Sequence, residues 1–225
     1  MHKKLTSIPV LFSSAFQVLR VRQYAIWFLI SGLVFTVISR LFVVLPSFLY
    51  LAMQATEQTT LYAILIGISV LFAWYGIVLS FALFLFVSRR IVLGQDIMVK
   101  KSLFEAHRVV GRVTVTIALF GLFVFLSLLL LIVPGILVGI LCFFAPTISV
   151  LGVHTKHPFR QSRALFKGRF WALFIRLALV YVFTIVPTYV LSFVHPIASQ
   201  AWGITTAFCS FLFTKIYLDA EQTKV

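Results

Sequence analysis

The chain has 225 residues, of which 62% are hydrophobic and 11% are charged; its mean hydropathy is +1.11 and its formal net charge at pH 7 is +14. Soluble domains carry about 25% charged residues, so this composition excludes an ordinary soluble globular domain. We expect a chain of this length to form one membrane domain without an additional soluble catalytic domain.

Charged residues are missing from long stretches of the chain. Only Arg40 and Glu57 are charged between Arg22 and Arg89, and no charged residue occurs in 113–155 or in 177–214. Each stretch exceeds the roughly 20 apolar residues that cross a bilayer core, so we expect each to fold back as a helical hairpin. Helices satisfy their own backbone hydrogen bonds in lipid, and continuously apolar runs differ from the alternating pattern of a barrel. We therefore expect an all-α polytopic membrane bundle, a single domain over residues 1–225, with six spans at about 24–50, 61–88, 113–133, 135–153, 171–193 and 197–215.

The basic residues lie on one side of this expected arrangement. Of the nineteen Lys and Arg residues, all except Arg40 and Arg176 lie before the first span, after the last span, or in the connections that follow spans two and four. The positive-inside rule then places both termini in the cytoplasm. Such a basic layer attracts anionic lipid by about 1 kcal/mol per well-placed residue. Nucleic acid is the alternative partner of a basic chain, but these residues lie at the membrane edges, so we expect membrane lipid as the partner and no nucleic acid. The three remaining connections, near 51–60, 133–136 and 193–197, hold no Lys or Arg.

A short, basic, amphipathic segment precedes each expected hairpin, at 3–20, 96–111 and 156–168. Each combines apolar residues at helical spacing with basic residues beside them. One interpretation is a helix in the plane of the cytoplasmic interface, which we favour for 3–20 and 156–168. The alternative is that these segments are N-terminal extensions of the spans. We expect this basic face to bind anionic phospholipid through Lys101, Arg108, Arg112, Arg160, Arg163 and Lys167.

Residues 132–174 carry a recognisable pattern. It consists of Pro134-Gly135, Pro146, Ser162-x-x-Leu165-x-Lys167-Gly168 and Trp171. The pattern resembles a group of bacterial multi-span membrane families of poorly defined function, related to the membrane domain attached to some glycerophosphodiester phosphodiesterases. The resemblance implies an integral protein of the bacterial inner membrane and no defined activity. Those families often carry an acidic residue shortly after the second proline, where this chain reads VLGV at 150–153.

The same residues also have structural interpretations. Pro134-Gly135 suits a tight turn between two helices, because both residues break helices. Pro146 removes a backbone hydrogen bond and is expected to kink its helix. Gly168 is expected to end the third amphipathic helix, with Trp171 at the level of the head groups.

The acidic residues are too few for most catalytic or ion-coupled mechanisms. The chain has Glu57, Asp96, Glu105, Asp219 and Glu221, none of them in the body of a predicted span. Coupled transporters commonly use a carboxylate near the midplane, and metal-assisted hydrolysis or phosphotransfer needs acidic ligands. The sequence also contains no HExxH and no glycine-rich phosphate loop. We therefore expect no enzyme activity, no catalytic residue and no cofactor.

Histidine and cysteine do not change this expectation. His154-x-x-His157 has no third metal ligand nearby in the sequence, so we expect no metal site. Cys142 and Cys209 both lie within predicted spans, which gives no indication of a disulfide framework.

Arg40 and Arg176 are charges inside predicted spans. An arginine at the bilayer centre costs at least about 2.5–3.5 kcal/mol. Arg176 is close enough to the cytoplasmic side to extend its charge to that surface, and Arg40 is close enough to the outer side. The alternative is that one or both face an internal cavity and bind an anionic group.

Two functions follow from these observations. The leading hypothesis is a non-enzymatic inner-membrane protein that binds anionic lipid along its basic face and acts in envelope organisation or lipid handling. The alternative is a transporter or channel for a small or anionic solute that uses Arg40 or Arg176. A polar cavity lined by either arginine favours transport, whereas a well-packed set of aromatic side chains favours the first hypothesis.

Overall fold

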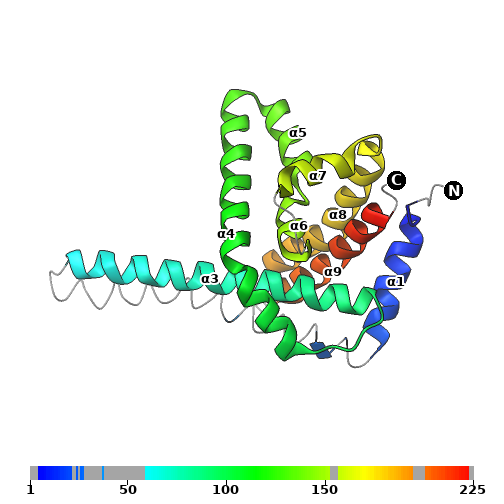
Figure 1. Cartoon of the computed structure of the whole chain (residues 1–225), viewed down its shortest axis with the longest axis horizontal. Coiled ribbons are helices and arrows are strands. Elements are labelled where there is room, and N and C mark those ends of the chain that lie inside the picture. The colour runs from blue at the N-terminus through cyan, green and yellow to red at the C-terminus, as the bar shows by residue number, and fades with distance from the viewer. Residues whose placement is uncertain are drawn as a thin grey trace.

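The structure is a computed structural model that describes residues 5–21, 24, 26–27, 37, 59–152, 157–194 and 201–222. Within these residues it consists of helices and contains no strand (Figure 1). The helices are α1 (Ile8–Arg20), α3 (Thr59–Val92), α4 (Val99–Leu130), α5 (Ile132–Cys142), α6 (Ala145–Leu151), α7 (Pro158–Phe166), α8 (Phe170–Val194) and α9 (Ala201–Gln222).

Within the described residues, three segments are helical, long and apolar enough to cross a membrane. They are Ile64–Val92 in α3, Val99–Leu129 in α4, and Ile132–Leu151, which comprises α5 and α6. Shorter apolar helices occur at Ile8–Val18 and Phe170–Phe183. These helices confirm the all-α class and are those expected of a membrane protein, while the division into six spans stays a prediction. Apart from residues 24, 26–27 and 37, the predicted first span at 24–50 lies outside the described residues.

The amphipathic segment at 96–111 is not a separate helix. Helix α4 runs without interruption from Val99 to Leu130, as the extension interpretation predicts for this segment. Ala106, Val110 and Val113 are all buried, which shows that one apolar face continues from the amphipathic part into the span. The chain reverses before α4 instead, where Gly94 has a φ of +66°.

The turn between α4 and α5 lies at Leu131, not at Pro134-Gly135 as expected. Leu131 has an extended backbone with φ −163° and ψ 137°, and α5 begins at the next residue. Pro134 therefore lies in the first turn of α5, where backbone N–H groups have no intrahelical acceptor and proline is tolerated. A Cβ atom at Gly135 would lie 2.8 Å from the backbone nitrogen of Leu128, so glycine here allows α5 to approach α4 closely.

The predicted fourth span at 135–153 is interrupted, as Pro146 suggested. Helix α5 ends at Cys142, a turn follows, and Pro146 occupies the second position of α6. The predicted helix end at Gly168 is also confirmed. Gly168 has a φ of +74° and separates α7 from α8, so 156–168 contains a helix of its own.

The buried core lies near the basic segments. Phe144 is fully buried, and its ring centroid is 5.8 Å from that of Phe166 and 6.2 Å from that of Tyr217. These contacts join the turn before α6 to α7 and α9, and Leu11 and Ala15 of α1 belong to the same core. The other contributions come from 78–91 of α3, 106–113 of α4, 173–180 of α8 and 209–220 of α9.

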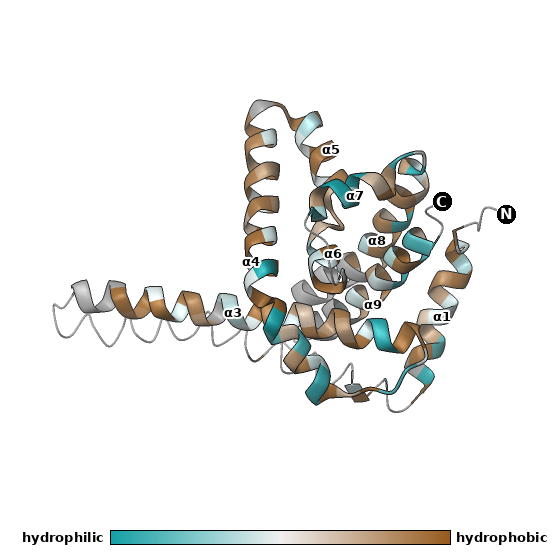
Figure 2. Ribbon diagram, viewed as in Figure 1, coloured by the Kyte–Doolittle hydropathy of each residue, from teal (hydrophilic) through white to brown (hydrophobic). Residues whose placement is uncertain are grey.

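The halves of α3 and α4 that do not belong to the buried core are apolar and exposed. Leu71 and Phe72 of α3 are 69% and 74% exposed, and Leu129 of α4 is 68% exposed. Figure 1 shows these halves extending away from the core in different directions, and Figure 2 shows predominantly hydrophobic residues along both. Contiguous apolar surface of this kind indicates contact with lipid or with another protein.

Candidate functional site

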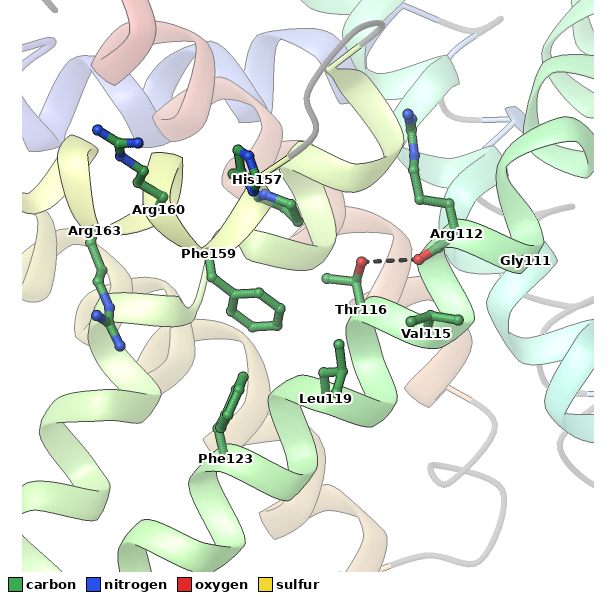
Figure 3. Close-up of a pocket in the computed structure, with 11 residues that line it drawn as sticks. Gly111, Arg112, Val115, Thr116, Leu119, Phe123, His157, Phe159, Arg160 and Arg163 are labelled. Atoms are coloured by element: carbon green, nitrogen blue, oxygen red, sulfur yellow. Dashed lines mark hydrogen bonds between the residues drawn. The ribbon is translucent and has the colours of Figure 1, made fainter.

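A groove with a volume of about 820 Å³ lies between α4 and α7 (Figure 3). Its floor is apolar. Val115, Leu119 and Phe123 follow one another at four-residue intervals along one face of α4. Phe159 of α7 meets Phe123 edge to face, with ring centroids 5.5 Å apart. A volume of this size is typical of small-molecule sites. We call this feature the α4–α7 groove.

Basic side chains border the α4–α7 groove. Arg160 and Arg163 lie on the α7 side, Arg112 lies on the α4 side, and His157 lies just before α7 (Figure 3). Arg160 and Arg163 are exposed, and neither makes a hydrogen bond or an ion pair with the described residues. Guanidinium groups bind carboxylates and phosphates through paired hydrogen bonds. An apolar floor with such a rim matches an amphiphile that has an anionic head group.

The buried face of α7 fixes the direction of its basic face. Leu165 and Phe166 belong to the core, and Ser162 is fully buried. The Ser162 hydroxyl donates to the carbonyl oxygen of Leu141 at the end of α5, over 2.7 Å. Because these residues face inward, Arg160 and Arg163 lie on the accessible side of the helix.

Two arginines from different helices bind the C-terminal end of α6. Arg112 donates to the carbonyl oxygens of Ser149 and Gly152, at 2.5 Å and 3.3 Å, and Arg89 donates to that of Leu151 at 3.2 Å. The last carbonyls of a helix lack intrahelical donors and carry a partial negative charge, which cations stabilise. Arg112 therefore has a structural role as well as a place at the α4–α7 groove.

A second pocket, of about 550 Å³, lies between the end of α3 and the first half of α4, and we call it the arginine pocket. Within it, Arg90 forms an ion pair with Glu105 at 3.3 Å. The guanidinium of Arg108 lies over the ring of Phe104, 5.6 Å from its centroid. The lining consists of Phe86, Arg89, Arg90, Gln95, Glu105, Arg108, Val109, Arg112 and Val150.

The six residues expected to bind lipid do not form a single site. Arg112, Arg160 and Arg163 border the α4–α7 groove, and Arg108 joins Arg112 at the arginine pocket. Lys101 lies at a separate hollow beside Met98, Phe104 and His107. Lys167 is exposed in the turn between α7 and α8. The apolar floor of the groove was missed, because the sequence signal of Val115, Leu119 and Phe123 is the same as that of a lipid-facing helix.

Arg176 is engaged with backbone carbonyls. Its Nε and Nη2 atoms donate to the carbonyl oxygen of Thr6, at 3.3 Å and 2.8 Å, and Nη1 donates to that of Ala172 at 2.7 Å. The guanidinium thus contacts the segment before α1, and whether it snorkels to the membrane surface stays a prediction. Its role in binding an anion stays a prediction. Arg40 lies outside the described residues.

Tyr217, the histidines and the cysteines are the remaining candidates for a reactive or metal-binding site. Burial, followed by the charge and the hydrogen bond of Glu221, raises the pKa of Tyr217 above its ordinary value, so this phenol stays neutral. No three His, Cys, Asp or Glu side chains gather into a metal-binding group within the part of the chain that the structure describes. His154 lies outside that part, and Cys142 and Cys209 are buried and are not in a disulfide.

Comparisons with protein-family models, with curated proteins and with solved structures gave no match for this chain. The function of this protein is therefore inferred from the geometry of the α4–α7 groove and of the arginine pocket.

Proposed function

We propose that this protein is a non-enzymatic integral membrane protein that holds an anionic phospholipid in the α4–α7 groove. Its role is then in lipid handling or envelope organisation. The observation that carries this proposal is the apolar floor between Phe123 and Phe159, bordered by Arg160 and Arg163, which lack partners among the described residues. Acyl chains fit the floor, and a phosphate head group pairs with a guanidinium group at the rim.

The same proposal includes six spans in a bacterial inner membrane, with both termini in the cytoplasm. It is supported by the position of the core, which lies on the side of the basic connections, and by the apolar exposed halves of α3 and α4. The resemblance of residues 132–174 to bacterial multi-span membrane families agrees with it.

The aromatic contacts favour this function over transport. The rings of Phe144, Phe166 and Tyr217 pack together, and Phe143 packs on Phe213 with centroids 5.0 Å apart. The three nitrogens of the Arg176 guanidinium are bonded to carbonyl oxygens. Within the described residues, these contacts correspond to a packed interior and not to a polar passage lined by Arg176.

Lipid retention by purified protein tests the proposal. Native mass spectrometry from mixed phosphatidylcholine and phosphatidylglycerol should show phosphatidylglycerol bound to the wild type. The double substitution Arg160→Gln with Arg163→Gln removes two charges at the groove. At about 1 kcal/mol per basic residue, its preference for phosphatidylglycerol should fall roughly thirtyfold.

The matched control is Lys100→Gln with Lys101→Gln, which removes the same charge from the beginning of α4, away from the groove. This variant should retain most of the lipid preference. An unchanged preference in the Arg160 and Arg163 variant, or an equal loss in both variants, would contradict a lipid site in the groove.

A further inference from the structure

The arginine pocket collects an unusual amount of positive charge. Four guanidinium groups line it, from Arg89, Arg90, Arg108 and Arg112, and a single carboxylate, from Glu105. The first two end α3 and the others lie on α4, so the pocket depends on the packing of the two helices and not on one run of sequence. Like charges gathered in a concave site repel one another and focus a positive potential on it.

Only part of the hydrogen-bonding capacity of these arginines is used. A guanidinium has five N–H groups. Arg89 uses one nitrogen for Leu151, Arg112 uses one nitrogen for two carbonyl oxygens, and Arg90 uses one for Glu105. Arg108 has only the ring of Phe104 as a partner among the described residues. The pocket therefore presents free donors from several directions.

We propose that the arginine pocket binds a phosphate-bearing group, with Arg108 donating directly to the phosphate oxygens and Arg89 and Arg112 contributing their unused N–H groups. Planar guanidinium groups match phosphate oxygens in geometry, and several of them together match a multiply charged anion. The site is distinct from the α4–α7 groove, although Arg112 borders both. The phosphate belongs either to a lipid head group or to a soluble molecule.

Glu105 is the competing anion in this pocket. Its carboxylate neutralises Arg90 and repels an entering phosphate. Arg108 strengthens binding and Glu105 weakens it, so substitutions at the two positions act in opposite directions. An opposite effect of this kind cannot arise from a general loss of folding.

The first experiment uses a soluble probe. The full chain is placed in nanodiscs of phosphatidylcholine, whose head group is neutral overall, and inorganic pyrophosphate is titrated by calorimetry. For a soluble ligand, the wild type binds pyrophosphate, Arg108→Gln weakens binding at least about tenfold, and Glu105→Gln strengthens it. The groove variant, Arg160→Gln with Arg163→Gln, should bind pyrophosphate within about twofold of the wild type.

The second experiment tests a lipid source. In the groove variant, phosphatidylglycerol retention is measured by native mass spectrometry with and without Arg108→Gln or Glu105→Gln. If pyrophosphate does not bind, but Arg108→Gln lowers lipid retention and Glu105→Gln raises it, the phosphate is that of a lipid head group. The groove variant itself tests the α4–α7 groove, so the two sites can fail separately.

Two results would overturn the proposal. One is that neither pyrophosphate binding nor lipid retention changes with Arg108→Gln. The other is that Glu105→Gln weakens binding, because a carboxylate that helps to hold the ligand is not a competing anion.

Discussion

Two serines that are both fully buried differ in what their hydroxyl groups contact. The Ser162 hydroxyl donates to the carbonyl of Leu141 and so joins α7 to α5. The Ser102 hydroxyl has no hydrogen-bond partner among the described residues. A buried hydrogen bond contributes about 1 kcal/mol, whereas a buried polar atom without a partner is unfavourable.

Alanine substitutions at these serines should therefore have opposite effects. Ser162→Ala is expected to lower the free energy of unfolding by about 1 kcal/mol, and Ser102→Ala is expected to leave it unchanged or to raise it. Thermal unfolding in detergent measures both, with the wild type as the reference. Equal losses in the two variants would contradict the inferred difference between the two hydroxyl groups, and no loss in Ser162→Ala would show that the Ser162 bond does not stabilise the protein.

Glycine is required at position 168 by the backbone conformation and not by contacts with neighbouring residues. Its φ is +74°, and a Cβ atom there would meet nothing within 4 Å. Gly168→Ala should lower the free energy of unfolding by about 1 kcal/mol, because the left-handed region is unfavourable for alanine. Gly121→Ala is the control: this glycine is also open, but it lies inside α4, where alanine favours the helix. A stabilising Gly168→Ala would contradict the left-handed turn.

Single residues also show what the sequence could predict. Pro146 and Gly168 interrupt helices through the local properties of their own backbones. Both helix breaks could therefore be identified without a structure. Pro134-Gly135 is compatible with a turn between helices, but a proline is equally compatible with the first turn of a helix. The roles of Arg89 and Arg112 could not be predicted, because their acceptors in α6 are distant in the sequence.

At the scale of elements, α6 depends on its neighbours. It has only seven residues, too few for a helix to be stable on its own. Its C-terminal carbonyls are bound by Arg89 of α3 and Arg112 of α4, and Ser149 and Thr116 share a hydrogen bond of 2.8 Å. Three helices are thus joined at this point by polar contacts within an otherwise apolar molecule.

Removing one of these contacts should destabilise the protein. Arg112→Gln deletes the guanidinium that binds the carbonyls of Ser149 and Gly152, and it should lower the free energy of unfolding by about 1–2 kcal/mol. Arg108→Gln, one turn earlier on α4, removes the same charge but no carbonyl contact within the described residues, so it should change stability by less than about 0.5 kcal/mol. Chemical denaturation in detergent compares the two. Equal stabilities of the two variants would show that the contact between Arg112 and the end of α6 does not stabilise the protein.

Hydropathy indicated where most helices lie, but it did not distinguish their boundaries. The segment at 96–111 has the same periodicity whether it is an in-plane helix or the beginning of a span, and the structure continues it into α4. The segment at 156–168 has a similar pattern but ends in a glycine that breaks the helix. A local stop signal, not amphipathicity, separates the two cases.

At the scale of the whole molecule, packing and charge are concentrated in the same region. The core contains 78–91 of α3 and 209–220 of α9, and the arginines at the end of α3 lie beside it. The halves of α3 and α4 that extend away are apolar and exposed. The sequence predicted the unequal distribution of charge, but it did not predict that the basic ends pack more tightly than the spans.

This distribution leads to a testable topology. We expect lipid to cover the exposed apolar halves, and basic segments are retained in the cytoplasm. Reporter fusions at His157 and at the C-terminus should therefore report a cytoplasmic location, and a fusion at Thr59 should report the outer side. A fusion at Gly94, in the turn between α3 and α4, is the matched control for Thr59 and should be cytoplasmic, because α3 separates the two positions. A cytoplasmic Thr59, or an external His157 or C-terminus, would rule out six spans with both termini inside.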